Sequence, residues 1–261
     1  MQHGSYEHIG VDTRGHVAII EIRRGPNNFV DTDMVGEIAD ALEVYDRTPE
    51  VRAIVLCAEG KHFCAGADFG GRGPDGVAKT AKRGRHLYKE AQRLWRTGKP
   101  IVAAVHGAAI GAGLGLAVMA DFRVACPEAR LSANFTRMNY HPGFGLTCTL
   151  PRLIGLQQAT MLMFTGRRVA GDEALTIGLV DYCVPADQVR AKALELATEI
   201  AGSGPLAIVA TRETLRRGLA DAVAAATERE YEEQAWLRDT SDFREGIKAM
   251  GERRAPNFQG R

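Results

Sequence analysis

Two glycine-rich turns have residue types and spacing that suit the binding of negative charge. In the first, the apolar run Val51–Ala58 leads into the turn His62–Phe69. In the second, Ile101–Val105 leads into His106–Leu116. Both turns place small residues just past a strand-like run, where the N–H groups of the next element have no backbone partner. Two such N–H groups that converge would form an oxyanion hole for a thioester or other carbonyl, and each donor contributes about 3–4 kcal/mol in acyl-transfer enzymes.

Close packing and nucleotide binding are further roles in which glycines of this kind occur. A glycine after a strand allows a helix to pack closely on a sheet, and this role stays open. Gly111 and Gly113 begin a dinucleotide fingerprint, but Leu116 stands where GxGxxG needs its last glycine. Lys61 follows Gly60, yet His62 does not complete the phosphate-loop pattern. The turns therefore favour close packing or carbonyl binding over nucleotide binding.

The elements that carry these turns alternate between strand and helix patterns. Short apolar runs rich in Val and Ile predict buried strands at His16–Arg24, Val51–Ala58 and Ile101–Val105. Apolar residues at helical spacing predict helices through Met34, Ile38, Leu42 and Tyr45, and through Leu87, Tyr88, Ala91, Leu94 and Trp95. The run Asp31-Thr32-Asp33 supplies capping residues for the first helix. Strand–helix–strand units of this kind predict an α/β core.

The pattern changes to helices alone after Val184. Gly, Pro and Ser residues separate four predicted helices at Asp187–Ala201, Pro205–Gly218, Leu219–Thr240 and Ser241–Gly251. The segment Gly70–Gly76 is predicted to be a mobile surface loop. We therefore expect a core at residues 1–195 and a helical C-terminal region at 196–261.

Composition and charge exclude several classes of protein. The 261 residues include 33 Lys and Arg against 32 Asp and Glu, a net charge of +1, and no block of like charges. This balance predicts neither a nucleic-acid partner nor an anionic membrane partner. No apolar run approaches the ~18–20 residues of a membrane span, and the first ten residues lack a signal-peptide pattern, so we expect a cytoplasmic protein.

The cysteines predict neither a disulfide framework nor a zinc site. Their number is odd and their spacing is wide, at Cys57, Cys64, Cys126, Cys148 and Cys183. Reduced, mostly buried thiols are the expectation. Cys64 lies in the first glycine-rich turn, where we expect it to pack rather than to act as a nucleophile.

Several strings in order resemble the crotonase, or enoyl-CoA hydratase/isomerase, superfamily. The matching strings are His62–Phe69, Ala103–Ala125, Leu150–Gly155, Phe164–Val180 and the terminal RRAPNFQGR. The resemblance covers almost the whole chain. It implies a ββα-spiral core with a helical C-terminal trimerisation region, in a homotrimer or a dimer of trimers. It also implies an acyl-CoA substrate in fatty acid metabolism, no metal and no redox cofactor, with coenzyme A present only as part of the substrate.

The resemblance also assigns roles to individual residues. The N–H groups of Ala67 and Ala112 would be the oxyanion donors. Contacts with the substrate would come from Asn28, Ala65, Gly66, Asp68, Phe69, Gly111, Phe135 and Gly143. The basic pair Arg23 and Arg24 would lie near the phosphates of coenzyme A.

The acids that such a resemblance leads one to expect are absent. Hydratases of the family use two glutamates, at the positions held here by Gly115 and Phe135. Some isomerases of the family keep a single acid, at the Phe135 position or directly after the proline, where this chain has Gly143. We therefore expect isomerase-, hydratase- or hydrolase-like chemistry with a proton shuttle other than glutamate. Carbon–carbon bond hydrolysis, decarboxylation and a catalytically silent acyl-CoA binder are the alternatives.

Tyr140 and His141, directly before Pro142, are the predicted replacements for the missing acids. An imidazole with a pKa near 6.5 suits acid–base work near neutrality, whereas a tyrosine with a pKa of about 10 acts mainly as a donor. His86 and Glu90 are a further i, i+4 pair, for which we expect a solvated helix face. Phe135 predicts an apolar pocket wall that suits a bulky acyl group.

Overall fold

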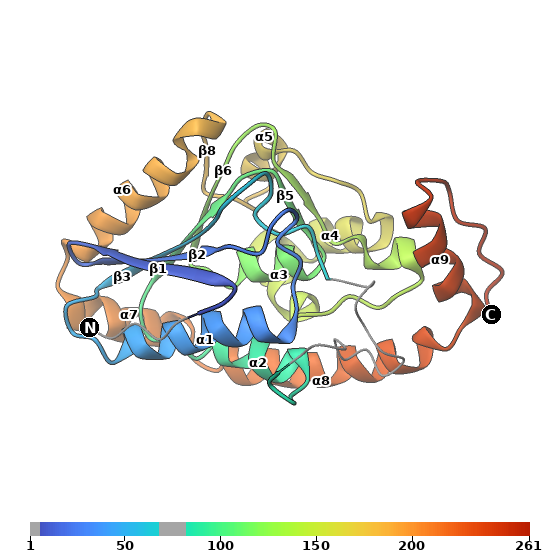
Figure 1. Cartoon of the computed structure of the whole chain (residues 1–261), viewed down its shortest axis with the longest axis horizontal. Helices are drawn as coiled ribbons and strands as arrows, with labels where there is room; N and C mark the ends of the chain where they lie inside the picture. The colour runs from blue at the N-terminus through green and yellow to red at the C-terminus, as the bar shows by residue number, and fades with distance from the viewer. Residues whose placement is uncertain (1–5, 68–81) are drawn as a thin grey trace.

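The fold is a mixed β-sheet with helices on both sides, seen in a computed structural model that describes residues 6–67 and 82–261 (Figure 1). The six strands of the main sheet are β1 (Ile9–Arg14), β2 (Val17–Ile22), β3 (Ala53–Ala58), β4 (Ile101–Val105), β6 (Phe122–Ala125) and β8 (Tyr182–Cys183). Their order is β1-β2-β3-β4-β6-β8, in which only the β1–β2 pair is antiparallel. A second, two-stranded parallel sheet joins β5 (Ala108–Ile110) to β7 (Arg130–Ser132).

The three predicted strands are confirmed as β2, β3 and β4. Every residue of these strands is buried, which explains why they show continuous apolar runs rather than alternation. Helix α6 (Val189–Ala201) packs on β2, β3, β4 and β6, while α1 (Thr32–Asp46) packs against β1 and β2 from the other side (Figure 1). The α/β fold expected from the sequence is therefore present.

All six helices predicted from the sequence are present, and the structure adds further helices that the sequence pattern did not predict. The α1 cap is Asp31, whose side chain accepts a hydrogen bond from the Met34 N–H at 2.8 Å. The remaining helices are α2 (Leu87–Leu94), α3 (Ala112–Val118), η1 (Asn134–Met138), α4 (Leu146–Thr165), α5 (Gly171–Thr176), η2 (Ala186–Gln188), α7 (Pro205–Leu215), α8 (Leu219–Arg238) and α9 (Ser241–Gly251). Helix α7 ends before the predicted Gly218, which has a positive φ of 74° and separates α7 from α8.

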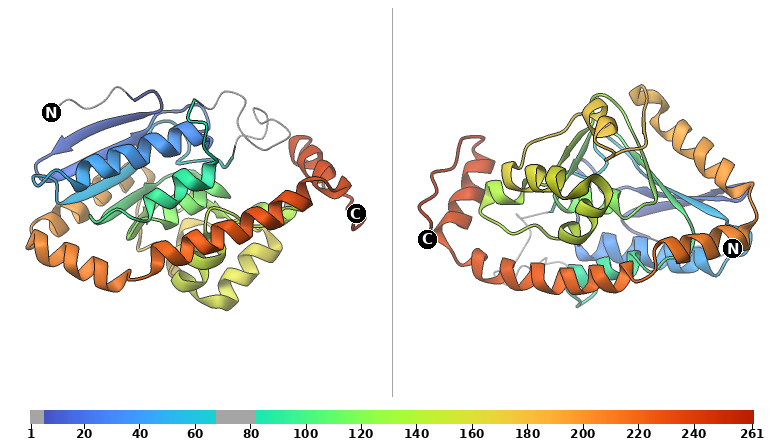
Figure 2. Two further views of the ribbon diagram at one scale, coloured as in Figure 1. Left: turned by 90° about the horizontal axis from the view of Figure 1, so that it is seen from below. Right: turned by 180° about the vertical axis from the view of Figure 1, so that it is seen from behind.

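The C-terminal helices reach across the molecule. Helix α8 runs below α1 and α2, contacts α2 and α4, and carries α9 at its far end (Figure 2). The expected boundary between residues 195 and 196 falls inside α6, and the division into two regions stays a prediction. Among the described residues, no single helix has the length and apolar composition to cross a membrane, although the segments 186–201 and 205–215, bent by 106°, pass that test as a pair.

Candidate active site

The structure brings the two glycine-rich turns into direct contact. The Cys64 N–H donates to the Ala108 carbonyl at 2.9 Å, and the Ile110 N–H donates to the Cys64 carbonyl at 3.1 Å. A Cβ on Gly113 would lie 2.3 Å from the Cys64 carbonyl oxygen, so only glycine fits there. The turns follow β3 and β4, whose carboxyl ends lie at the same edge of the sheet because these strands are parallel.

This close contact makes Gly113→Ala a test of how the turns are joined. The new methyl group would collide with backbone atoms of the Cys64 turn, and overpacking of this kind costs about 1–3 kcal/mol. We expect the free energy of unfolding, measured by denaturant titration, to fall by that amount. Gly251→Ala is the control because a Cβ there meets no atom within 4 Å. Equal stability of the two variants would contradict the contact.

Among the described residues, the N–H groups of Ala67 and Ala112 are not used in the hydrogen bonds that join the turns. Ala67 forms a parallel bridge with Val30, in which the Val30 N–H donates to the Gly66 carbonyl at 2.8 Å. The N–H of Ala67 itself therefore points away from Val30. Ala112 is the first residue of α3, where N–H groups lack helical partners. Within residues 6–67 and 82–261, neither N–H group has a hydrogen-bond partner, and their role as oxyanion donors stays a prediction.

Phe135 lies beside the second turn, as expected of a pocket wall. Gly111 precedes α3 with φ 56° and ψ −118°, and its N–H donates to the Ser132 carbonyl at 2.8 Å. A Cβ on Gly111 would lie 3.6 Å from Cζ of Phe135. The Phe135 ring is buried and gives this side of the turn an apolar surface, next to Oδ1 of Asn134, which would lie 3.5 Å from the same Cβ.

The position of the first missing glutamate is closed by an aromatic ring. A Cβ on Gly115 would lie 2.7 Å from Cδ1 of Phe144 and 2.9 Å from its Cβ. Phe144 is fully buried and has a positive φ of 62°, a conformation that is rare for a bulky residue. A glutamate at position 115 would therefore require Phe144 to move.

The position of the isomerase acid is also filled, and here the occupant is polar. A Cβ on Gly143 would lie 1.9 Å from the Tyr88 hydroxyl oxygen and 2.6 Å from Nε2 of Gln234. The buried Tyr88 hydroxyl donates to Oε1 of Gln234 at 2.8 Å, and Nε2 of Gln234 donates to the His141 carbonyl at 2.8 Å. The Tyr88 hydroxyl thus occupies the space where a side chain at position 143 would begin.

Tyr88 is the residue that sequence reasoning missed. Its spacing correctly placed it among the buried residues of α2. A buried tyrosine hydroxyl usually has a hydrogen-bond partner. This tendency is the one feature of the sequence that indicates a polar contact at Tyr88. The partner, Gln234, lies 146 positions away in the sequence, and local spacing cannot identify such a contact.

Tyr140 and His141 lie beside a different hollow. Tyr140 is buried, its hydroxyl accepts a hydrogen bond from Nη2 of Arg238 at 2.8 Å, and its ring lies 4.8 Å from that of Phe243. Nδ1 of His141 lies 2.7 Å from the Pro142 carbonyl oxygen. Both residues line a hollow of about 360 Å³ that none of the described residues of the two turns lines. This hollow does not place them relative to Ala67 and Ala112, and their role in proton transfer stays a prediction.

Asn28 ties the loop before α1 to the first turn. It is fully buried with a positive φ of 51°. Its Nδ2 donates to the carbonyls of Glu59 at 2.9 Å and His62 at 2.8 Å, and its Oδ1 accepts from the Arg24 N–H at 2.9 Å. The amide is thus fully used inside the protein, which indicates a structural role for Asn28.

Of the other residues predicted to contact the substrate, some already have partners inside the protein and some lie outside the described residues. Arg24 is paired with Asp31 at 2.6 Å, and Arg23 is half-exposed and paired with Glu21 at 2.7 Å. The Ala65 N–H is used by the Asn27 carbonyl at 3.0 Å. Asp68, Phe69 and the loop predicted at 70–76 lie outside the described residues.

The Cys64 thiol packs inside the first turn, as expected. It is fully buried, and burial raises its pKa to about 12, so it is not a thiolate at neutral pH. Among the residues that the structure describes, no group of three or more His, Cys, Asp or Glu side chains could hold a metal ion. That no cofactor is needed stays a prediction.

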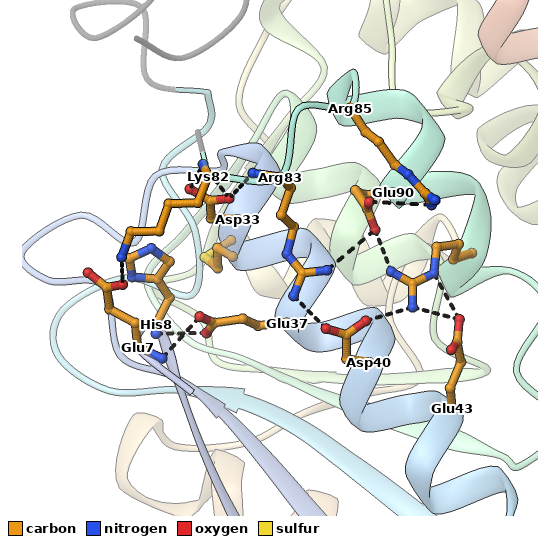
Figure 3. Close-up of polar contacts among 12 residues, drawn as sticks. Glu7, His8, Asp33, Glu37, Asp40, Glu43, Lys82, Arg83, Arg85 and Glu90 are labelled. Atoms are coloured by element: carbon orange, nitrogen blue, oxygen red, sulfur yellow. Dashed lines mark hydrogen bonds and ion pairs between the residues drawn. The ribbon is translucent and has the colours of Figure 1, made fainter. Parts of the chain in front are cut away.

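The expectation of a solvated face at His86 and Glu90 is wrong for Glu90. Its side chain is buried in an ion pair with Arg93, and Arg83 and Arg85 are each 4.0 Å away (Figure 3). The His86 ring instead lies 4.5 Å from that of Tyr231. Glu90 is buried because α1 and α2 pack through charged side chains at this point, which apolar spacing does not show.

This ionic cluster fixes where the chain enters α2. Asp33 accepts hydrogen bonds from the N–H groups of Lys82 at 2.9 Å and Arg83 at 3.2 Å (Figure 3). Arg93 contacts Asp40 at 2.7 Å. Burial alone would raise the pKa of Asp40, but hydrogen bonds from Arg83 and Arg93 hold it below its ordinary value. The cluster thereby supports the helix that carries Tyr88.

A second buried carboxylate, Glu230, caps α4 next to the Gly143 turn. Its oxygens accept hydrogen bonds from the Gly145 N–H at 2.8 Å, the Thr147 N–H at 3.0 Å and the Thr147 hydroxyl at 2.6 Å. Burial raises its pKa from an ordinary 4.5 to about 7, although these hydrogen bonds oppose the rise. Because Glu230 lies on the long polar helix α8, its burial is not visible in the sequence pattern.

Glu230 makes stability depend on pH in a predictable direction. Between pH 4.5 and about 7 the folded protein binds a proton at Glu230 that the unfolded chain has released. Stability from this group therefore falls as pH rises through that window, by about 3 kcal/mol in total. Denaturant unfolding of Glu230→Gln should show a flatter pH dependence than the parent across this window. An unchanged slope would contradict the raised pKa.

Comparisons with known proteins agree with this fold. The family model described as enoyl-CoA hydratase/isomerase matches residues 12–261. The enoyl-CoA hydratase EchA19 of Mycobacterium tuberculosis is 33% identical, with 96% of each chain covered. The (E)-benzylidenesuccinyl-CoA hydratase of Thauera aromatica is 31% identical, with 97% of this chain and 99% of the relative covered.

The similarity extends to solved structures. The crystal structure of an enoyl-CoA hydratase/isomerase from Pseudoalteromonas atlantica superposes with a TM-score of 0.87 at 28% identity, covering 97% of this chain and 100% of the other. The family model and the relatives together span almost the whole chain. The chain therefore belongs to the enoyl-CoA hydratase/isomerase family and is a crotonase-fold enzyme.

Proposed function

We propose that the protein binds an acyl-CoA thioester and stabilises its enolate through the N–H groups of Ala67 and Ala112. The observation that carries this proposal is the junction of the two turns, which leaves both N–H groups without partners within the described residues. Donors held in place before the reaction stabilise the developing oxyanion without reorganisation. The family membership supports an acyl-CoA as the ligand.

The reaction is isomerase- or hydrolase-like rather than hydration by two glutamates. Phe144 fills the side-chain space of Gly115, and Phe135 makes the neighbouring wall apolar. An apolar wall beside the oxyanion donors suits a bulky or ring-bearing acyl group and strengthens electrostatic interactions by excluding water. The relative named for benzylidenesuccinyl-CoA supports an aromatic substrate class.

The Tyr88 hydroxyl is the polar group best placed to handle a proton in this site. It stands at the position of the isomerase acid, against Gly143. Tyr140 and His141, the candidates from the sequence, line a hollow that the two turns do not reach among the described residues. A phenol with an ordinary pKa of about 10 serves as a hydrogen-bond or proton donor at neutral pH.

The test of this function is hydrogen exchange at the substrate α-carbon. Saturated, unsaturated and ring-bearing acyl-CoAs are incubated with the protein in heavy water, and mass spectrometry follows deuterium uptake, isomerisation, water addition and thioester loss. Deuterium uptake shows enolate formation and supports the proposal. Binding without exchange across the panel would contradict it and favour the alternative of a catalytically silent acyl-CoA binder.

We further propose that the protein assembles as a homotrimer or a dimer of trimers. Large apolar side chains remain exposed on helices α4, α7 and α8, namely Leu156, Phe164, Leu206, Leu215 and Trp236. Exposed apolar groups of this size on several helices are typical of surfaces that bind another chain. Light scattering coupled to size-exclusion chromatography would give the mass, and a monomer would contradict this assembly.

A further inference from the structure

A buried charge cluster lies at the edge of the sheet opposite the glycine-rich turns. Asp121 directly precedes β6, and its carboxylate accepts a hydrogen bond from the N–H of Ile101, the first residue of β4, at 2.8 Å. The glycine-rich turns follow the carboxyl ends of β3 and β4. Because these strands are parallel, Asp121 lies at the other end of the sheet.

Two arginines share the single carboxylate of Asp121. Nε of Arg212 lies 3.0 Å and 2.9 Å from its two oxygens, and Nη1 of Arg216 lies 2.7 Å from one of them. The neighbouring Arg123 already pairs with Asp181 at 3.1 Å. Asp121, Arg212 and Arg216 together therefore carry one more positive charge than negative charge, and they lie in a largely buried place.

Three N–H donors, two on these arginines and one on the neighbouring Trp95, have no hydrogen-bond partner among the described residues. They are Nη2 of Arg212, Nε of Arg216 and Nε1 of Trp95, and all three atoms are buried. Arg212 is only 8% exposed as a whole residue, and the Arg216 guanidinium lies 5.3 Å from the centre of the Trp95 ring. Buried donors without acceptors are rare in native proteins and call for a physical cause.

Two adjoining hollows reach these side chains. Trp95 and Arg216 line both of them, one of about 190 Å³ and the other of about 400 Å³. Arg212 lines the larger one. The arginines that line the pair are Arg96, Arg123, Arg152, Arg212, Arg216 and Arg217. Within the described part of the chain, only three carboxylates face them, those of Asp121, Glu213 and Asp221, although the whole chain has a net charge of only +1.

We propose that these hollows form a binding site for a small anion with carboxylate or phosphate oxygens. The anion lies in the hollows beside Arg216, where its charge balances the second guanidinium on Asp121. Guanidinium groups bind such oxygens through two parallel N–H donors. Arg216 must turn about its side-chain torsions to present its buried Nε to the anion. The site is separate from the acyl-CoA site because the two lie at opposite edges of the sheet.

Isothermal titration calorimetry on the full chain tests this site, with inorganic phosphate and citrate as probes at constant ionic strength. We expect saturable binding, and the stronger of the two probes identifies the preferred oxygen chemistry. Arg216→Gln should weaken binding by at least about tenfold because it removes charge-assisted hydrogen bonds. Arg229→Gln is the matched control, since Arg229 is an exposed arginine on α8 that pairs with Glu232 and Glu233.

Each outcome decides for or against the site. Saturable binding that Arg216→Gln weakens and Arg229→Gln preserves supports it. Equal binding by the two variants, or heat that only follows salt concentration, overturns it. A saturating acyl-CoA should leave anion binding unchanged, and displacement of the anion would place it in the acyl-CoA site instead. Circular dichroism of Arg216→Gln shows whether the variant is folded, and Arg216→Lys, which keeps one charge, provides a second reading with intermediate affinity.

Discussion

Proline in place of Ala112 should lower the rate of enolate formation on an acyl-CoA by about 10²- to 10³-fold, the effect of removing one oxyanion donor. Proline has no N–H group, so the substitution deletes the proposed donor alone. Ala112 is the first residue of α3, and the first helical turn is where proline is tolerated. The preceding Gly111, with φ 56°, has the freedom to accommodate the proline ring.

Deuterium exchange at the substrate α-carbon measures this loss directly. Ala112→Ser is the matched control because serine keeps the backbone N–H at the same position. The control should exchange at a rate close to that of the parent protein, and equilibrium binding of a saturated acyl-CoA should change far less than the rate in Ala112→Pro. If the two variants exchanged equally, the N–H of Ala112 would not be an oxyanion donor.

The sequence is sufficient to predict most of the scaffold. Strands β2, β3 and β4 are continuous apolar runs because helices cover both faces of the sheet, so their burial is visible in composition alone. The four C-terminal helices are separated by Gly, Pro and Ser, which local chemistry places at helix ends. Strands β5, β7 and β8 have three residues or fewer, too short to produce a pattern that predicts them.

The site is predictable only where its chemistry is local. The glycine-rich turns can be recognised because small residues follow strands within a few positions. The contacts of Phe144 with Gly115 and of Tyr88 with Gly143 join residues that are far apart in sequence. The burial of Glu90 and Glu230 depends on partners from other segments of the chain. Residue spacing in the sequence does not show which side chain fills the space beside a distant residue. For this reason the sequence pattern predicts Tyr140 and His141 rather than Tyr88.

Removal of the Tyr88 hydroxyl should have an effect comparable with the loss of an oxyanion donor. General acid–base groups contribute about 10²- to 10⁴-fold to the reaction rate. Tyr88→Phe removes the hydroxyl oxygen that is the nearest atom to the place where a Cβ on residue 143 would lie. The variant keeps the ring and its packing against His86. We expect α-carbon exchange or isomerisation to fall at least about 10²-fold, with little change in acyl-CoA binding.

Tyr140→Phe separates proton handling from structural support. Tyr140 is also buried and also has its hydroxyl in a hydrogen bond, to Arg238 at 2.8 Å, so the two substitutions remove the same group from similar surroundings. Because Tyr140 lines a hollow that none of the described turn residues lines, its variant should keep most of the exchange rate.

Gln234→Leu provides the second comparison. It removes the hydrogen-bond partner of the Tyr88 hydroxyl and should shift the pH profile of the reaction while leaving the hydroxyl in place. A large loss in Tyr140→Phe with none in Tyr88→Phe would return the proton shuttle to the turn before Pro142, and the space at Gly143 would then be a matter of packing alone.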